Sequence, residues 1–265
     1  VPPGFTIAAS LCLTYLETRQ FPPWLRSQVE TSLQRLEAAT NRHFGGKDRP
    51  LLLSVRSGAA VSMPGMMETI LNLGLNEATV AGLTTDSGNA QFAWDSSRRF
   101  VAMYSTVVLD LSRGPFEHML EARQKKAGVT RDIDLPAAEM QALVKEFKAH
   151  SEKESGKPFP DDPMEQLWGA IAAVFESWNT RRAIDYRKLH DIPDTLGTAV
   201  NVVTMVFGNL GDDSGTGVAF TRDPSTGERK LYGEYLVNAQ GEDVVSGSRN
   251  VEDIAKLKDD MPQAF

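Results

Sequence analysis

The sequence has very little cysteine. Cys12 is the single cysteine, so the chain cannot form an internal disulfide. No cluster of cysteine and histidine has the spacing of zinc ligands. A chain without disulfides fits a reducing compartment, and we predict a cytoplasmic location.

An excess of positive charge is also missing. The formal net charge is −7, which argues against a nucleic-acid or membrane-surface role, because both need a basic surface. No apolar run reaches the roughly 18 residues that a membrane span needs, and nothing resembles a signal peptide. The chain opens at Val1 without a methionine and closes at Phe265 without a turn or tail, so we expect both ends to be cuts inside a longer protein.

The patterning of the 265 residues predicts an α/β (α+β) fold in three parts. The first part, residues 1–110, is a mixed subdomain. In it we expect a strand at 5–7, a helix within 23–44, a buried strand at 51–56, a loop over 57–65 and a helix containing Met67, Ile70 and Leu71. Residues 92–109 combine helical signals with aromatic positions.

The second part, residues 111–195, is predicted to be a helical insertion. Apolar residues recur at helical spacing over 135–150 and over 167–178. We expect Arg181, Arg182, Arg187 and Lys188 in the last turns of the second of these helices. The third part, residues 196–265, is β-rich, with strands at 199–207, 218–221 and 232–237 and a turn at 223–227.

Arg56 is the first candidate binding residue. It ends a predicted buried strand and precedes a loop of small residues, where a guanidinium and backbone amides can hold phosphate oxygens. A structural ion pair beside a turn is the alternative.

Three other segments are weaker candidates. Residues 202–207 could offer backbone to a purine, or be a plain core strand. The glycine-rich run 208–217 fits neither a P-loop nor a dinucleotide fingerprint, and we expect a hairpin loop between two strands. Residues 233–247 concentrate carboxylates and amides, which suit Mg²⁺, a polar interdomain contact or a solvated loop.

Taken in order, these segments closely resemble the pyruvate, phosphate dikinase family, and the resemblance covers essentially the whole chain. It rests on Val-Pro-Pro-Gly-Phe-Thr-Ile at 1–7, Ser-Gly-Ala at 57–59, Ser-Met-Pro-Gly-Met-Met at 62–67, Ile-Leu-Asn-Leu-Gly-Leu-Asn at 70–76, Arg-Arg-Phe at 98–100, Gln-Leu-Trp-Gly-Ala-Ile at 166–171, Gly-Thr-Ala-Val-Asn-Val at 197–202, Phe-Thr-Arg-Asp-Pro-Ser-Thr-Gly-Glu at 220–228 and Asn-Ala-Gln-Gly-Glu-Asp-Val-Val at 238–245.

The resemblance implies an ATP-grasp-like nucleotide-binding domain, in which two subdomains clamp ATP and Mg²⁺ accompanies the nucleotide. Members of the family interconvert ATP, phosphate and pyruvate with AMP, diphosphate and phosphoenolpyruvate through a phosphohistidine on another domain. That domain and ATP or AMP are the implied partners, and a homo-oligomer is expected. By position, Arg56 and the loop residues Ser62, Gly65, Met66 and Thr69 bind phosphates, and Met205 and Val206 form the adenine hinge. Arg99, Glu234, Gln240, Glu242 and Asp243 are assigned to the site rim or to domain docking.

Parts of the family pattern lie outside this sequence. The phosphate-binding lysine is expected upstream of Val1, and the metal ligands are expected downstream of Phe265. We therefore expect the isolated chain to bind ATP weakly or not at all and to be inactive, with no catalytic residue and no metal ligand of its own. A non-catalytic module that binds a nucleotide or a partner, and part of a phosphoenolpyruvate synthase, are the alternative interpretations.

Overall fold

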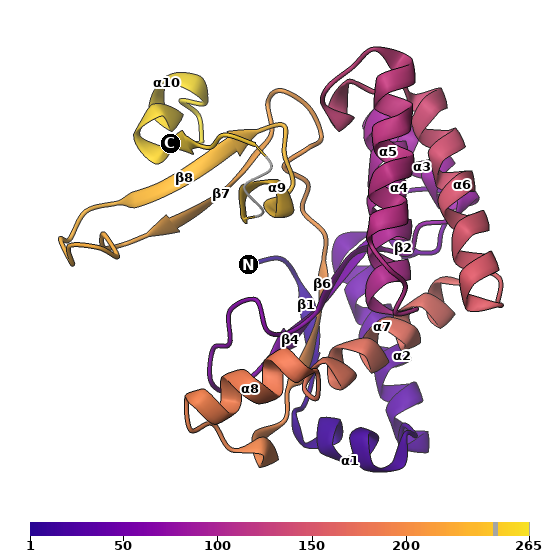
Figure 1. Cartoon of the computed structure of the whole chain (residues 1–265), viewed down its shortest axis with the longest axis vertical. Helices are drawn as coiled ribbons and strands as arrows, with labels where there is room; N and C mark the ends of the chain where they lie inside the picture. The colour runs from indigo at the N-terminus through magenta and orange to yellow at the C-terminus, as the bar shows by residue number, and fades with distance from the viewer. Residues whose placement is uncertain (246–248, 265) are drawn as a thin grey trace. The chain divides into compact units, whose positions relative to one another are not determined.

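A computed structural model describes residues 1–245 and 249–264, and these divide into two compact units, Val1–Met205 and Val206–Phe265. Helices and antiparallel strands occur together in the chain, so the predicted mixed fold class is confirmed (Figure 1). We describe each unit by itself. The division into three parts, at 110 and 195, stays a prediction.

A four-stranded antiparallel sheet lies at the centre of the first unit, in the order β1-β6-β4-β5. Its strands are β1 (Gly4–Ile7), β6 (Ala199–Thr204), β4 (Leu53–Gly58) and β5 (Thr69–Leu73). A short parallel pair, β2 (His43–Phe44) and β3 (Pro50–Leu51), stands apart from it. The sheet therefore joins segments from the start, the middle and the end of the unit.

Helices are the other main elements of the first unit. They are α1 (Ser10–Thr18), α2 (Pro23–Thr40), α3 (Glu77–Ser87), α4 (Ala90–Val107), α5 (Gly114–Ala127), α6 (Ala137–Ser155), α7 (Pro163–Ser177) and α8 (Arg181–Leu189), with the 3-10 turns η1 (Asp132–Asp134) and η2 (Asp194–Leu196). The helix α3 begins with a capping box, in which Asn76 Oδ1 accepts from the Thr79 amide at 3.0 Å and Thr79 Oγ1 accepts from the Asn76 amide at 2.7 Å.

The helix α7 covers one face of the sheet. It packs on β4, β5 and β6 through apolar side chains that are fully buried, including Leu167, Ile171 and Val174. Gln166, which is also fully buried, accepts from the Gly74 amide at 3.0 Å and donates to the Leu75 carbonyl at 3.1 Å. This one amide satisfies the backbone just beyond β5, so α7 and the sheet are fixed to each other.

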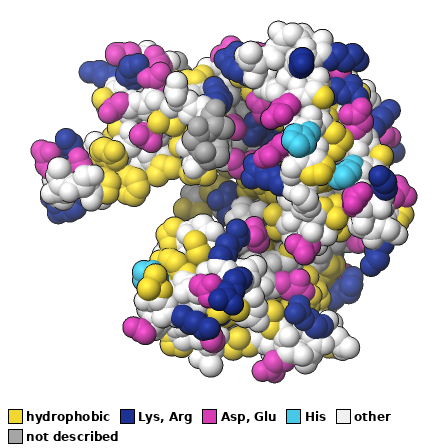
Figure 2. Space-filling model, in the orientation of Figure 1, with side chains coloured by type: hydrophobic (Ala, Val, Ile, Leu, Met, Phe, Trp, Pro, Cys, Tyr) yellow, Lys and Arg dark blue, Asp and Glu magenta, His cyan; other side chains and the backbone are white. Residues whose placement is uncertain are grey.

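The second unit is built on a three-stranded antiparallel sheet in the order β7-β8-β9. Its elements are β7 (Gly215–Phe220), β8 (Tyr232–Val237), α9 (Gly241–Val245), β9 (Glu252–Asp253), the 3-10 turn η3 (Ile254–Lys256) and α10 (Leu257–Asp260). Apolar side chains are exposed along the β7–β8 hairpin, as the space-filling view shows (Figure 2). They are Val218, Phe220, Leu231 and Tyr232.

Three expectations about single elements are wrong. The segment with Met67, Ile70 and Leu71 is not helical; it forms β5, because Thr69 and Ile70 pair with Arg56 and Val55 of β4. The expected long helix ends at Ser177, and Arg181, Arg182, Arg187 and Lys188 belong to a separate helix, α8. Tertiary contacts outweighed local periodicity in both places.

The third error concerns the glycine-rich run 208–217. It does not close a hairpin between paired strands, because β6 ends at Thr204 in one sheet and β7 begins at Gly215 in another. Part of the run is a close approach of backbones within the second unit: a Cβ on Gly208 would lie 2.5 Å from the Ala239 carbonyl oxygen. Glycine is needed there for space.

Candidate functional site

Four side chains form a polar row across the central sheet. Cross-strand register places Thr6 of β1 opposite Asn201 of β6, Asn201 opposite Arg56 of β4, and Arg56 opposite Thr69 of β5. Opposed residues of antiparallel strands project from the same face, so these four share one face of the sheet. Buried Val200 and Val202 alternate with Asn201 in β6 and turn to the face that α7 covers. The row is therefore on the opposite, polar face.

Hydrogen bonds and a glycine surround Asn201 in this row. Thr6 donates to Asn201 Oδ1 at 2.7 Å, and Asn201 Nδ2 donates to the Ser57 carbonyl at 3.3 Å, so the amide lies across β4. A Cβ on Gly58 would come within 2.6 Å of that Nδ2, so a larger residue there would displace the Asn201 side chain. Sequence reasoning missed Thr6 and Asn201, although the alternation of residues 199–204 indicates a polar face.

Arg56 is the exposed cation in this row. Its Nε donates to Ser54 Oγ at 3.3 Å. Within residues 1–245 and 249–264, the terminal nitrogens Nη1 and Nη2 donate to no carboxylate or carbonyl, so the structure does not show the ion pair that was the alternative interpretation. A guanidinium with both terminal nitrogens open to solvent can give paired hydrogen bonds to an anion.

The loop between β4 and β5 carries the other predicted phosphate contacts. Thr69 lies beside Arg56 in register, whereas Ser62 and Gly65 are exposed on the loop. Gly65 has φ 72°, and the Met66 amide donates to the Met63 carbonyl at 3.1 Å in the same turn. The structure places Thr69 opposite Arg56, and among residues 1–245 and 249–264 no hydrogen bond joins Arg56 to Ser62, Gly65 or Met66.

Arg182 of α8 anchors the end of this loop. Its Nε donates to the Met66 carbonyl at 3.2 Å, and its guanidinium forms an ion pair with Glu68. The Glu68 amide donates to Ser177 Oγ at 3.3 Å. The loop is thus fixed at its β5 end, while Ser62 is exposed. Sequence reasoning had placed Arg182 in a helix terminus without a partner.

The predicted adenine hinge follows β6. The Met205 amide donates to the Leu52 carbonyl at 2.9 Å, and Met205 is the last residue of the first unit. Met205 lies four residues beyond Asn201, and an extended chain places it about 13 Å along the strand from the polar row. Val206 is the first residue of the second unit, and its side chain is exposed.

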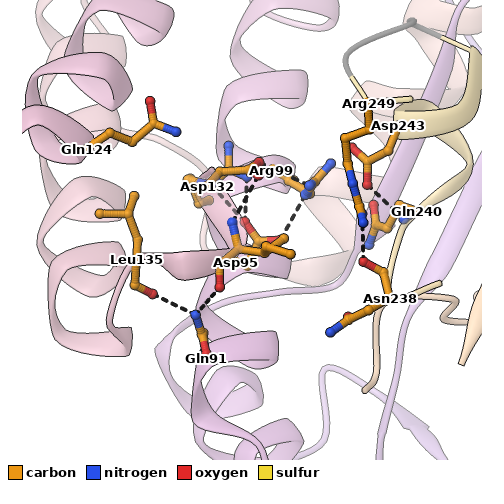
Figure 3. A network of polar contacts seen from close by, with 12 residues as sticks. Gln91, Asp95, Arg99, Gln124, Asp132, Leu135, Asn238, Gln240, Asp243 and Arg249 are labelled. Carbon is orange, nitrogen blue, oxygen red and sulfur yellow. Dashed lines mark hydrogen bonds and ion pairs between the residues drawn. The ribbon is translucent and has the colours of Figure 1, made fainter. Parts of the chain in front are cut away.

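Arg99 lies in an ion network of the first unit (Figure 3). Its Nε pairs with Asp95 at 2.9 Å and its Nη2 pairs with Asp132 at 3.1 Å, while Arg98 contacts the same two carboxylates. Burial alone would raise the pKa of Asp95, but Arg98 and Arg99 outweigh it, and the pKa of Asp95 is lowered. This network joins α4 to η1.

The remaining predicted residues belong to the second unit. Glu234 is exposed on β8. Gln240 and Asp243 are buried, and Asp243 Oδ2 accepts from the Gln240 amide at 2.9 Å at the start of α9, where Glu242 also lies (Figure 3). Arg249 donates to the Asn238 carbonyl at 2.8 Å. Residues 246 and 247 of the predicted carboxylate-rich segment lie outside the described residues.

In the stretches 1–245 and 249–264, no three side chains of His, Cys, Asp or Glu gather closely enough to hold a metal ion. Among the helices of the same stretches, none is long and apolar enough to cross a membrane.

Comparison with known proteins identifies the family of the chain. The family described as "Pyruvate phosphate dikinase, AMP/ATP-binding domain" matches residues 6–264. The chain belongs to this family.

Its relatives are dikinases that are much longer than this chain. It is 54% identical to "Pyruvate, phosphate dikinase" of Rhizobium meliloti (strain 1021), 50% identical to "Pyruvate, phosphate dikinase" of Clostridium symbiosum and 51% identical to "Pyruvate, phosphate dikinase 1, chloroplastic" of Zea mays. Each alignment covers 100% of the chain but 31%, 30% and 28% of these relatives, respectively. The chain thus spans about 30% of the length of the curated relatives that it matches.

Proposed function

We propose that the chain binds ATP or AMP and is the nucleotide-binding part of a pyruvate, phosphate dikinase. The observation that carries the proposal is the open guanidinium of Arg56 in the polar row, on a family whose description is an AMP/ATP-binding domain. The reaction of the whole protein would be that of its relatives: ATP, phosphate and pyruvate are interconverted with AMP, diphosphate and phosphoenolpyruvate.

In this proposal each part of the site has one task. Arg56 pairs with phosphate oxygens, and the Thr69 hydroxyl beside it offers another donor. The exposed backbone amides around Ser62 and Gly65 approach the phosphates from the β4–β5 loop. The backbone of Met205 and Val206 contacts the adenine, and an extended ATP spans a distance comparable to that between Met205 and the polar row.

The chemistry asked of this chain is positioning and charge neutralisation. Mg²⁺ would arrive on the triphosphate, whose oxygens are the hard ligands it prefers. The family resemblance places the metal ligands downstream of Phe265, so we assign no residue of this chain to the ion. A phosphohistidine domain of the same protein would receive the phosphoryl group. Arg99, Glu234, Gln240, Glu242 and Asp243 are proposed for the site rim or for domain docking.

The clamp of an ATP-grasp fold, a homo-oligomeric whole protein and a cytoplasmic location complete the proposal. The location needs its own test, because the name of the maize relative includes "chloroplastic". Fluorescent tagging of the protein in its own cells would decide it, and a signal confined to an organelle would contradict the cytoplasmic location.

The binding proposal is tested by titrating the chain with ATP and following backbone amide signals by NMR, which measures weak affinities. Arg56→Ala should weaken binding about tenfold or more, because a charge-assisted pair of hydrogen bonds is lost. Arg56→Lys should restore little, since a point charge cannot reproduce a fork of donors. Arg35→Ala is the matched control, because Arg35 is exposed on α2 in the same unit. Equal affinities for Arg56→Ala and the control would overturn the phosphate role.

The catalytic proposal needs the full-length protein and two partial reactions. Arg56→Ala should slow the ATP-dependent formation of phosphohistidine and leave the transfer from phosphohistidine to pyruvate unchanged. Equal slowing of both reactions, together with a lower melting temperature, would mean that Arg56 holds the fold instead.

A further inference from the structure

Ser54 is buried on the same face of the sheet as the polar row. It lies two residues before Arg56 on β4, so the two side chains project from the same face. Arg56 is exposed, but only 2% of Ser54 is. The side chain of Arg56 reaches back along the strand to Ser54, as the Nε to Oγ distance of 3.3 Å shows.

The hydrogen bonds of Ser54 have a fixed direction. Its hydroxyl donates to the Val203 carbonyl of β6 at 3.3 Å. A hydroxyl has one hydrogen, so the oxygen of Ser54 is left to accept, and the Nε–H of Arg56 is the donor that it meets. Ser54 therefore connects the backbone of β6 to the guanidinium of Arg56 through these two hydrogen bonds, and we call this connection the relay.

This relay decides which edge of the guanidinium remains for a ligand. A guanidinium offers paired donors either from Nε and one terminal nitrogen or from the two terminal nitrogens. Because Nε is engaged by Ser54, the pair Nη1 and Nη2 is the open fork. A long, exposed arginine otherwise keeps considerable rotamer freedom, which it must lose when it binds an anion.

We propose that Ser54 is a positioning residue for nucleotide binding, which holds Arg56 so that a phosphate is bound end-on by Nη1 and Nη2. The inference rests on the proposed function of Arg56 as a phosphate ligand. It extends that function by naming the edge of the guanidinium that meets the phosphate and the residue that selects it.

The first test observes the relay in the unmodified chain. With ¹⁵N-labelled arginine, the Nε–H signal of Arg56 is identified by its loss in Arg56→Lys. We expect that proton to exchange with water more slowly than the Nε–H of exposed Arg35, and Ser54→Ala should speed its exchange. Equal exchange rates for Arg56 and Arg35 in the unmodified chain would overturn the proposal, whether or not Ser54→Ala folds.

The second test measures ATP affinity by the same NMR titration in a double-mutant cycle. Ser54→Ala should weaken ATP binding about threefold to tenfold in the unmodified background and have no further effect when Arg56 is already alanine. Ser54→Thr keeps the hydroxyl and should bind like the unmodified chain. Ser57→Ala, on the other face of the same strand, is the matched control and should leave the affinity unchanged.

The outcomes distinguish a failure of this inference from a failure of the proposed function on which it rests. If Arg56→Ala weakens binding and Ser54→Ala does not, the positioning role is wrong and the phosphate role stands. If Ser54→Ala weakens binding equally with and without Arg56, Ser54 acts through the sheet and the inference fails. If Arg56→Ala itself has no effect, the proposed function fails first.

Discussion

Replacement of Asp95 by asparagine tests the ion network of the first unit. Asp95 is 4% exposed and accepts from both Arg98 and Arg99, whose side chains are 8% and 9% exposed. Asp132 bridges the same two arginines, but its side chain is 26% exposed. Asp95 is therefore more buried than Asp132, and the variant removes a carboxylate that pairs with both buried cations.

The size of the effect follows from burial. Removing one partner of a buried ion pair costs about 3–5 kcal/mol, because the other charge stays buried and uncompensated. We expect Asp95→Asn to lower the free energy of unfolding of the first unit by an amount at the lower end of that range, because Asp132 still pairs with both arginines. Asp132→Asn is the control, and water can replace part of its contact. It should cost about 1.5 kcal/mol, the lower end for a hydrogen bond to a charged group.

The assay can be confined to the first unit. All four tryptophans, at positions 24, 94, 168 and 178, precede Met205, the last residue of that unit. Urea unfolding followed by tryptophan fluorescence therefore reports on the first unit, while a second probe such as circular dichroism follows the whole chain.

The dependence on pH gives a second, independent check. The arginines lower the pKa of Asp95, so its charged form stabilises the folded state at pH values above the pKa of an unfolded aspartate, and this contribution is lost as pH falls through the folded pKa. The difference in free energy of unfolding between the unmodified chain and Asp95→Asn should therefore be constant near neutrality and shrink below about pH 4. An Asp95→Asn effect no larger than that of Asp132→Asn, or independent of pH down to pH 2, would refute the reasoning.

Three further substitutions have expected outcomes. Gly82→Ala should lower the free energy of unfolding by about 1–3 kcal/mol, because the new Cβ would lie 1.9 Å from the Lys47 carbonyl oxygen; a gain of about 1 kcal/mol in urea unfolding, as in an open helix, would contradict this. Arg187→Ala should lower the free energy of unfolding by about 3 kcal/mol in the same assay, because the side chain is 2% exposed and its guanidinium lies 4.2 Å from the centre of the Trp178 ring. A decrease below about 1 kcal/mol would show that the stack contributes little. Arg182→Gln should release the β4–β5 loop and speed limited proteolysis there, mapped by mass spectrometry, and an unchanged cleavage rate would mean that the loop is held by other contacts.

Elements with one dominant signal could be predicted from the sequence. The strand expected at 5–7 is β1, the helix expected within 23–44 is α2, and the strand at 232–237 is β8. Errors arose where the same few residues fit both a helical and a strand pattern. Met67, Ile70 and Leu71 fit helical spacing, but pairing with β4 decides for a strand, and that pairing depends on residues far along the chain.

The candidate site shows the same limit. Arg56 could be found because an apolar run precedes it and small residues follow it, although β4 continues beyond the expected end at Arg56 to Gly58. Ser54, Thr6 and Asn201 could not be joined to it, because their neighbourhood exists only once β1, β4 and β6 have paired in register. Local patterns identify strands, whereas register decides which of their side chains meet.

The pairing of β1 with β6 also governs when the central sheet can form during protein synthesis. Thr6 and Asn201 are partners separated by 195 positions, so β1 leaves the ribosome long before the strand that it pairs with. At about 5–20 residues per second, that interval is about 10–40 s. Local helices such as α2, α4 and α6 can form meanwhile, but β4 lacks its neighbour β6 until residues 199–204 have emerged. The polar row around Arg56 is therefore among the last parts of the first unit to be completed on the nascent chain.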